Sequence, residues 1–240
     1  MEKSREEKIK TALEYYLSEA SLKDLPRTGW LDWHVQRDRI ESVAEHSHAS
    51  QHLAYAIWSE FDIPVNIDRV IAMLAFHENE EPVIGDIPLV SDIKVYKTEI
   101  GKIAVTSILE KMARKQYAQS LITEFEERKT KEAKFARFID KLECDLTSKL
   151  YDEEDAVDLN NQSDNASSLV PLVAKLLSEG KSFGEMWMEF GREVYGYPEE
   201  FESISEYAER TNLHELRDAN LDKAKAKVKS FLNSVIKSTE

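Results

Sequence analysis

Apolar residues recur every three to four positions along most of the chain, which is the period of a helix rather than the alternation of a strand. This pattern predicts helices over residues 4–22, 42–61, 95–114, 117–127, 131–151, 169–179, 183–195, 199–213 and 216–238, and one more that begins near Asn66. In the first of them, one amphipathic face is marked by Ile9, Leu13, Tyr16 and Leu17. Only 7 glycines and 6 prolines interrupt 240 residues, and long runs are rich in Leu, Ala, Glu and Lys. We therefore predict an all-α fold.

The periodic pattern breaks in two places. Residues 25–39 have no clear period but carry two tryptophans, one histidine and three arginines, as ligand-binding loops often do. Residues 152–168 are acidic and rich in Asn and Ser, which predicts a loop or a partly disordered connection. We predict a principal domain over residues 1–151 and a helical C-terminal extension over residues 152–240, packed on the same domain.

The stretch 75–88 sets five ionisable side chains directly behind an apolar helical run. Because this run has the spacing of a buried helix face, His77 is expected at the helix end, pointing towards the interior. His77 and Glu81 stand four residues apart on one face, and Glu78 can share an ion with His77 only near a helix terminus. An imidazole with neighbouring carboxylates is typical of a hard-cation or mixed nitrogen–oxygen metal site, with a general acid or base beside it.

A proline and a glycine shape the end of the same stretch. Pro82 is expected to prevent further helix beyond Glu81. Gly85 permits a tight turn, which would present Asp86 beside the other acidic groups.

A second group of histidines opens the helix over residues 42–61. Ser42 is a plausible N-cap and Glu45 completes a capping box, so His46 falls in the first or second turn. His48 and His52 lie four residues apart and could form a metal pair of their own. Since no second acidic partner stands at helical spacing, we interpret them as surface residues or as outer partners of a metal site.

Two further features have two interpretations each. Asp140 lies among large apolar residues, where a charged carboxylate is costly unless it binds a metal or forms a salt bridge with an arginine. Trp30 and Trp33 could line a ligand site, or they could pin their loop to the core. The sequence pattern alone leaves both questions open.

Charge and cysteine content narrow the functional classes. The formal net charge is −14, and no basic block precedes the C-terminal helix, which argues against binding of duplex nucleic acid. A small anion remains compatible, because it needs only two or three local cations. Cys144 is the only cysteine, so no internal disulfide can form. We see no signal segment or membrane-spanning run, and expect a cytoplasmic protein.

Four separated motifs, in this order, resemble the HD-domain superfamily and within it the deoxyribonucleoside 5′-monophosphate phosphatases, or 5′-nucleotidases. They are Pro-Arg-Thr-Gly-Trp at 26–30, Glu-Ser-Val-Ala-Glu-His at 41–46, His-Glu-x-x-Glu with Gly-Asp-Ile-Pro at 77–88, and Phe-Ile-Asp-Lys-Leu at 138–142. The resemblance runs from about residue 10 to about residue 150. It implies an HD-domain helical bundle with additional C-terminal helices.

The resemblance also implies roles for individual residues. One divalent ion, of Mn, Co, Mg, Fe or Zn, would be held by His46, His77, Glu78 and Asp140. Glu81 would act as the catalytic acid or base at the phosphate. Asp86 would hold the deoxyribose 3′-hydroxyl, and Trp30 would line the substrate pocket. Binuclear members of the superfamily have further histidines, whereas beyond His77 this chain has only His214, which favours a single metal.

The chain departs from the family pattern at three points. The family's phosphate-binding arginine directly precedes the tryptophan, where this chain has Gly29, so Arg27 is the candidate and Arg37 or Arg39 are alternatives. Glu78 replaces the usual aspartate and is one methylene longer. Extra residues stand between Trp30 and the first histidine ligand.

The resulting prediction is a metal-dependent phosphohydrolase that releases phosphate from deoxyribonucleoside 5′-monophosphates. One alternative is an HD hydrolase acting on nucleoside triphosphates or on other phosphate monoesters. Another is a degenerate HD domain that binds a nucleotide or a partner protein. We expect a small nucleotide substrate, no duplex nucleic acid and no membrane partner. The oligomeric state is left open, with a homodimer as one possibility.

Overall fold

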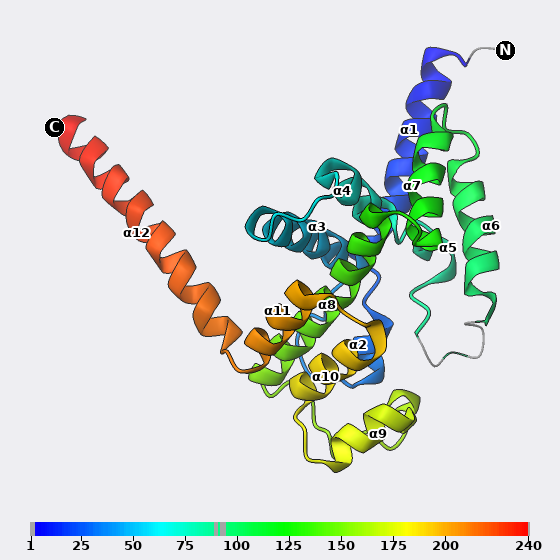
Figure 1. The fold of residues 1–240 in the computed structure, drawn as a ribbon. Coiled ribbons are helices and arrows are strands. Elements are labelled where there is room, and N and C mark those ends of the chain that lie inside the picture. The colour runs from blue at the N-terminus through cyan, green and yellow to red at the C-terminus, as the bar shows by residue number, and fades with distance from the viewer. Residues whose placement is uncertain (1–2, 89–90, 92–94, 240) are drawn as a thin grey trace.

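The computed structural model describes residues 3–88, 91 and 95–239, and the regular secondary structure in this part of the chain is helical (Figure 1). The helices are α1 (Arg5–Ala20), η1 (Ser21–Lys23), α2 (Thr28–Asp32), α3 (Val43–Glu60), α4 (Ile67–Phe76), α5 (Glu81–Ile84), α6 (Lys97–Leu109), α7 (Lys115–Glu127), α8 (Lys131–Glu153), η3 (Ala166–Leu169), α9 (Pro171–Ser178), α10 (Phe183–Tyr195), α11 (Glu199–Glu209) and α12 (Leu213–Thr239). Among the described residues there is no strand, only an isolated bridge between Pro26 and Ser42. The prediction of an all-α fold is confirmed.

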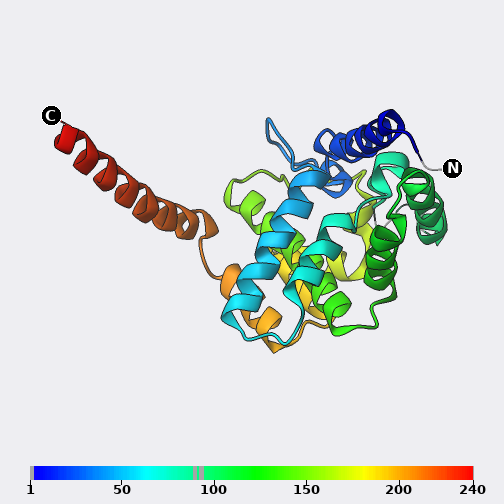
Figure 2. The same ribbon diagram turned by 90° about the horizontal axis from the view of Figure 1, so that it is seen from above.

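The long helix α8 lies at the centre of the bundle. It packs against α3, α4 and α7 and also against α10 and α11 from the C-terminal part of the chain. Figures 1 and 2 show these helices around α8 from two directions. The predicted apolar stripe of α8 is buried, with Phe135 at 5% exposure and Ile139 and Leu142 at 0%. A residue on α8 is therefore held from several sides, which suits a site that needs fixed geometry.

Two apolar clusters fill the interior. One joins α3, α4, α7, α8 and α11, and includes Met73, Leu74 and Leu121. The other joins the loop after α2 to α9 and α10, and includes Trp30, Trp33 and Phe183. The second cluster combines residues from both sides of position 151. The division into a domain at 1–151 and an extension at 152–240 stays a prediction.

Side-chain caps fix several helix starts. Ser42 and Glu45 form the predicted capping box of α3, with Ser42 Oγ accepting from the Glu45 N–H. Asn66 caps α4 and Thr130 caps α8: each side-chain oxygen accepts a hydrogen bond from the backbone N–H three residues further on. Because α3, α4 and α8 carry the candidate ligands, these caps set where each ligand falls along its helix.

Two local expectations differ from the structure, and a third is met in one of its alternatives. The apolar face of α1 is exposed, with Ile9, Leu13, Tyr16 and Leu17 at 53–64% exposure, because α1 packs only along the edge of the bundle. Pro82 does not prevent helix; it stands at the start of the one-turn helix α5, where its missing N–H costs nothing. Residues 154–165, between α8 and η3, form the loop that was one of the two predicted alternatives, and Gln162 Nε2 ties it to the core by donating to the Trp33 carbonyl oxygen at 3.1 Å.

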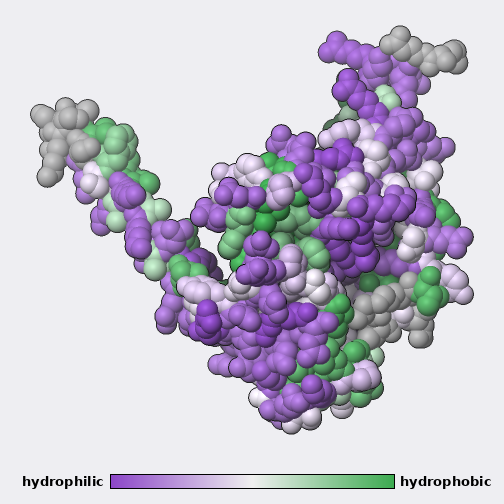
Figure 3. All heavy atoms as spheres, in the orientation of Figure 1, coloured by the Kyte–Doolittle hydropathy of each residue, from purple (hydrophilic) through white to green (hydrophobic). Residues whose placement is uncertain are grey.

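The last helix, α12, projects away from the bundle (Figures 1 and 2). The surface in Figure 3 shows hydrophilic and apolar side chains along it, and Leu221 and Val228 are 44% and 59% exposed. Nowhere in the described part of the chain is a helix both long and apolar enough to cross a membrane.

Gly191 sits where α10 meets α8 and leaves no room for a side chain. A Cβ atom there would lie 2.1 Å from Oδ2 of Asp145, whose side chain is fully buried and accepts a 2.7 Å hydrogen bond from Tyr197 Oη. Because this carboxylate is fixed, we expect Gly191→Ala to lower the free energy of unfolding by about 1–3 kcal/mol. Urea unfolding followed by circular dichroism measures the change.

Gly101, inside α6, is the matched control. A Cβ there would make only ordinary contacts, the nearest at 3.5 Å to Glu80 Cγ. Gly101→Ala should leave stability unchanged or raise it by up to about 1 kcal/mol, because alanine favours helix. Equal unfolding midpoints for the two variants would contradict the packing argument.

Candidate active site

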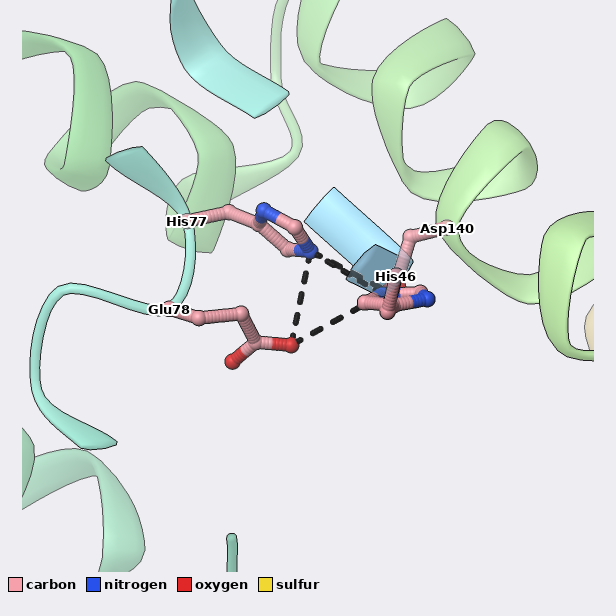
Figure 4. Close-up of side chains that lie close together, drawn as sticks. All are labelled: His46, His77, Glu78 and Asp140. Carbon is pink, nitrogen blue, oxygen red and sulfur yellow. Dashed lines mark hydrogen bonds and ion pairs between the residues drawn. The ribbon is translucent and has the colours of Figure 1, made fainter. Parts of the chain in front are cut away.

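Four side chains from three helices converge on one point (Figure 4). His46 comes from the first turns of α3, His77 and Glu78 directly follow α4, and Asp140 comes from the middle of α8. One ligand atom from each lies within 4.8 Å of all the others. The structure thus brings together the whole predicted ligand set from segments far apart in sequence.

The hydrogen bonds of the two histidines leave matching lone pairs at this point. His77 Nδ1 lies 2.8 Å from the Leu74 carbonyl oxygen, and His46 Nδ1 lies 2.5 Å from Glu143 Oε2. Both partners are oxygen acceptors, so each Nδ1 carries a proton, and in a neutral ring the Nε2 atom is then unprotonated. Although burial opposes it, the neighbouring Glu143 and Asp140 carboxylates raise the pKa of His46, so a cation at this point would take the place of the second proton on that ring. The two Nε2 atoms nevertheless face each other at 3.3 Å. Two facing lone pairs repel, and a cation between them removes the conflict.

The other four distances are compatible with one octahedral ion. The two longer ones, 3.9 Å from His46 Nε2 to Glu78 Oε1 and 4.0 Å from His77 Nε2 to Asp140 Oδ1, are near the roughly 4.2 Å between opposite ligands of such an ion. Asp140 Oδ1 lies 3.3 Å from His46 Nε2, and Glu78 Oε1 lies 3.4 Å from His77 Nε2. Ligands about 2.1 Å from one ion are spaced roughly 3.0–3.4 Å apart in tetrahedral or octahedral arrangements. Burial lowers the pKa of His77, which keeps its ring neutral and able to bind metal. The longer Glu78 side chain therefore still reaches the point that the other three share.

The salt-bridge interpretation of Asp140 is confirmed, and the metal interpretation stays a prediction. Its Oδ1 faces the histidines, while its Oδ2 accepts from Arg137 at 2.7 Å and lies 3.2 Å from Lys141 Nζ. A buried carboxylate at 2% exposure is thereby compensated on both sides.

Glu81 lies beside the cluster with one oxygen unused. It is 1% exposed, its Oε1 is 3.5 Å from Lys97 Nζ, and its Oε2 is buried without a hydrogen-bond partner. Burial, with Glu78 and Asp86 nearby, raises the pKa of Glu81 to about 10. The carboxyl therefore holds a proton at neutral pH and can donate it.

Arg27 and Asp86 lie next to each other near the cluster. Arg27 Nη1 is 3.4 Å from Glu78 Oε1, and Arg27 Nη2 donates to Cys144 Sγ at 3.3 Å. Asp86 Oδ2 accepts from the Thr28 N–H at 2.8 Å, which ties the turn after Gly85 to the start of α2. Asp86 therefore has a structural role in addition to its predicted role in sugar binding.

The structure separates the three candidate arginines. Arg37 pairs with Glu154 at 2.9 Å and Arg39 pairs with Glu45, and both arginines line a separate surface hollow. Arg27 lines the same cavity as the cluster. Of the three, Arg27 is placed to contact a phosphate there.

Trp30 lies in the core, and His48 and His52 lie on the surface. Trp30 is 2% exposed and its Nε1 donates to Glu41 Oε2 at 2.8 Å, so it belongs to the core, although it also lines the cavity. His48 and His52 are exposed, with ring centroids 4.5 Å apart, and stand outside the ligand cluster.

The cavity has a volume of about 690 Å³, within the range of small-molecule sites. Sequence reasoning missed three cationic residues that line the cavity and one acidic partner of His46: Lys97, Arg137, Lys141 and Glu143. The last three are within three positions of Asp140 on α8, so helical spacing could have indicated them. Lys97 comes from α6, and no local spacing in the sequence connects it to the cluster.

Comparison with known sequences decides the family. The sequence profile described as HD domain matches residues 20–171. The chain belongs to the HD domain family. Human 5'-deoxynucleotidase HDDC2 is 29% identical over 182 residues, covering 71% of this chain and 86% of the human protein. The Xenopus laevis protein of the same name is 30% identical over 147 residues, covering 60% and 71%.

Solved structures of low sequence identity share the fold. The PH0347 protein of Pyrococcus horikoshii OT3 aligns with a TM-score of 0.53 at 24% identity, covering 75% of this chain and 98% of that one. A protein of Magnetospirillum magnetotacticum MS-1, titled as a predicted metal-dependent phosphohydrolase, aligns with a TM-score of 0.54 at 22% identity, covering 75% and 95%. The predicted HD-domain fold and the prediction of a hydrolase are confirmed at the level of the family.

Proposed function

We propose that this HD domain is a metal-dependent phosphohydrolase that releases phosphate from deoxyribonucleoside 5′-monophosphates. The observation that carries the proposal is the pair of Nε2 atoms 3.3 Å apart, with two carboxylates, beside a cavity lined by His77, Glu78 and Asp140 together with Arg27, Glu81 and Asp86. Relatives at 29–30% identity are named 5'-deoxynucleotidases, which supports the choice of substrate.

The phosphate group is expected at the cluster end of the cavity. His46, His77, Glu78 and Asp140 would hold one divalent ion, which when bound supplies charge neutralisation and an activated water. Arg27, buried beside Glu78 and Asp86, would bind a phosphate oxygen by a charge-assisted hydrogen bond. Lys97, whose Nζ is 3.5 Å from Glu81, adds a second positive charge near the same oxygens.

Glu81 would move the proton that hydrolysis requires. Breaking the bond between phosphorus and the 5′-oxygen leaves negative charge on that oxygen, which a nearby acid must neutralise. Glu81 is protonated at neutral pH and its Oε2 has no other partner, so it would give its proton to the 5′-oxygen of the departing nucleoside. Asp86 would accept from the sugar 3′-hydroxyl through its oxygen that Thr28 does not use.

A panel of phosphate esters tests this function. Purified protein would be assayed for phosphate release from deoxynucleoside monophosphates, ribonucleoside monophosphates, deoxynucleoside triphosphates and p-nitrophenyl phosphate, each with Mn, Co, Mg, Fe or Zn. We expect the highest kcat/KM for deoxynucleoside monophosphates. A higher kcat/KM for deoxynucleoside triphosphates, or for p-nitrophenyl phosphate, would show that the proposed substrate class is wrong. No release from any ester with any metal would favour the degenerate binding domain.

A further inference from the structure

The cavity has a second group of lining residues that the family profile does not reach. They belong to α9 and α10 and are apolar or aromatic: Val173, Met186, Trp187 and Phe190. The profile ends at residue 171, before these side chains. In Figure 1, α10 and α9 lie on the side of the bundle where α2 carries Trp30. The C-terminal helices thus help to line a cavity whose charged lining residues include His77, Glu78 and Asp140.

Aromatic rings dominate this second group. The Trp187 ring lies 5.4 Å from Trp30 and 6.5 Å from Phe190, measured between centroids. Trp30 also meets Tyr151 edge-on at 5.3 Å, which fixes its orientation. Trp30 and Phe190 are 2% and 7% exposed. The rings form an apolar wall in which Trp30 and Phe190 pack mainly against their neighbours, while the half-buried Trp187 keeps surface for a ligand. An aromatic ring can stack on any nucleobase, because every base has a π-face.

The wall also contains one hydrogen-bond donor that nothing in the protein uses. The Trp187 Nε1 atom is buried and has no hydrogen-bond partner, whereas the Nε1 of its neighbour Trp30 donates to Glu41. A buried N–H without an acceptor is costly and therefore rare in native structures. A ligand atom that accepts from Trp187 would remove that cost. Because Nε1 is closed off from solvent in this structure, the half-buried indole must turn towards the cavity when it donates to such an atom.

We propose that the α9–α10 wall is the nucleobase subsite, and that Trp187 donates its indole N–H to an acceptor on the base edge. The inference rests on the proposed function, since it takes the substrate to be a deoxynucleotide. Every common nucleobase offers a carbonyl oxygen or an unprotonated ring nitrogen as acceptor. A phosphate or a bare sugar would instead leave the aromatic wall in contact with water.

The test replaces Trp187 by phenylalanine, which keeps a ring and removes the N–H. We expect Trp187→Phe to raise the KM for thymidine and deoxyadenosine monophosphates about 3- to 10-fold, the range of one neutral hydrogen bond, with kcat unchanged. Hydrolysis of 2-deoxyribose 5-phosphate, which lacks a base, should be unaffected. Trp187→Ala also removes the stacking surface and should raise the nucleotide KM about 10- to 100-fold.

Trp58→Phe is the control, because Trp58 packs in the other apolar cluster, away from the cavity. It should change neither KM. Equal losses on the nucleotides and on deoxyribose 5-phosphate, or no loss on either, would overturn the assignment of Trp187.

A binding measurement separates this inference from the proposed activity. Calorimetric titration with thymidine and with deoxyadenosine, which have a base but no phosphate, needs no turnover. If the wild type releases no phosphate from nucleotides, the proposed activity fails. The base subsite then still stands if Trp187→Phe weakens nucleoside binding, and it is refuted if the nucleosides do not bind or bind both proteins equally.

Discussion

Glu81→Gln should lower kcat for phosphate release by about two to four orders of magnitude, the usual contribution of a general acid or base. Glutamine keeps the shape and burial of Glu81 but has no proton to give to the departing 5′-oxygen. Because Glu81 is not among the four ligand side chains, metal content should stay at the wild-type level. Steady-state kinetics, with metal analysis of the same preparation, measures both quantities.

Glu19→Gln is a matched control for this variant. Glu19 on α1 also has a buried carboxyl oxygen without a partner, and burial raises its pKa to about 7, but it does not line the cavity. Its kcat should stay within a factor of about three of the wild type. Should Glu81→Gln retain more than a tenth of the activity, another group must supply the proton.

The second large effect concerns the ligand set. His46→Ala, His77→Ala and Asp140→Ala should each weaken metal affinity by more than about 100-fold, beyond the roughly 10- to 100-fold loss typical of an outer partner. Phosphate release should fall together with metal affinity. Chelation of the metal from the wild-type protein should abolish phosphate release. Titration of Mn or Co into metal-free protein, with circular dichroism to verify folding, gives the affinities.

Two other variants give metal affinities for comparison with the ligand variants. His48→Ala is the control on the same helix, since His48 is exposed and outside the cluster, and it should leave metal affinity unchanged. Glu143→Gln should fall between, near the 10- to 100-fold range, because Glu143 holds the proton-bearing Nδ1 of His46. An empty site in His48→Ala with a full site in His46→Ala would move the ligand to the other histidine.

Spacing along single helices was enough to predict much of the fold. The apolar period placed α3, α4, α8 and α10 to within a few residues, because these helices bury one face each. Resemblance to the HD-domain motifs supplied the ligand set before any geometry was available. The placement of His48 and His52 on the surface also followed from the missing acidic partner at helical spacing.

Other features depend on contacts that no local pattern contains. The face of α1 has a core-like period, yet Leu13 and Leu17 are exposed, because burial is decided by what packs opposite a helix. Pro82 is read equally well as the end of one helix or the start of the next. Trp187 and Lys97 reach the cavity from α10 and α6, and only the tertiary structure brings those helices to the cluster.

The convergence of α3, α4 and α8 on one point links stability to metal concentration. The ligands at positions 46, 77 and 140 come close only when all three helices are docked, so the unfolded chain has no comparable site. An ion that binds only the native state stabilises it by RT ln(1 + [M]/Kd), about 2.7 kcal/mol at a free concentration of 100 Kd. The melting temperature of this protein would then rise with the concentration of free metal. In a cell poor in that metal, the free energy of unfolding of the enzyme would be lower.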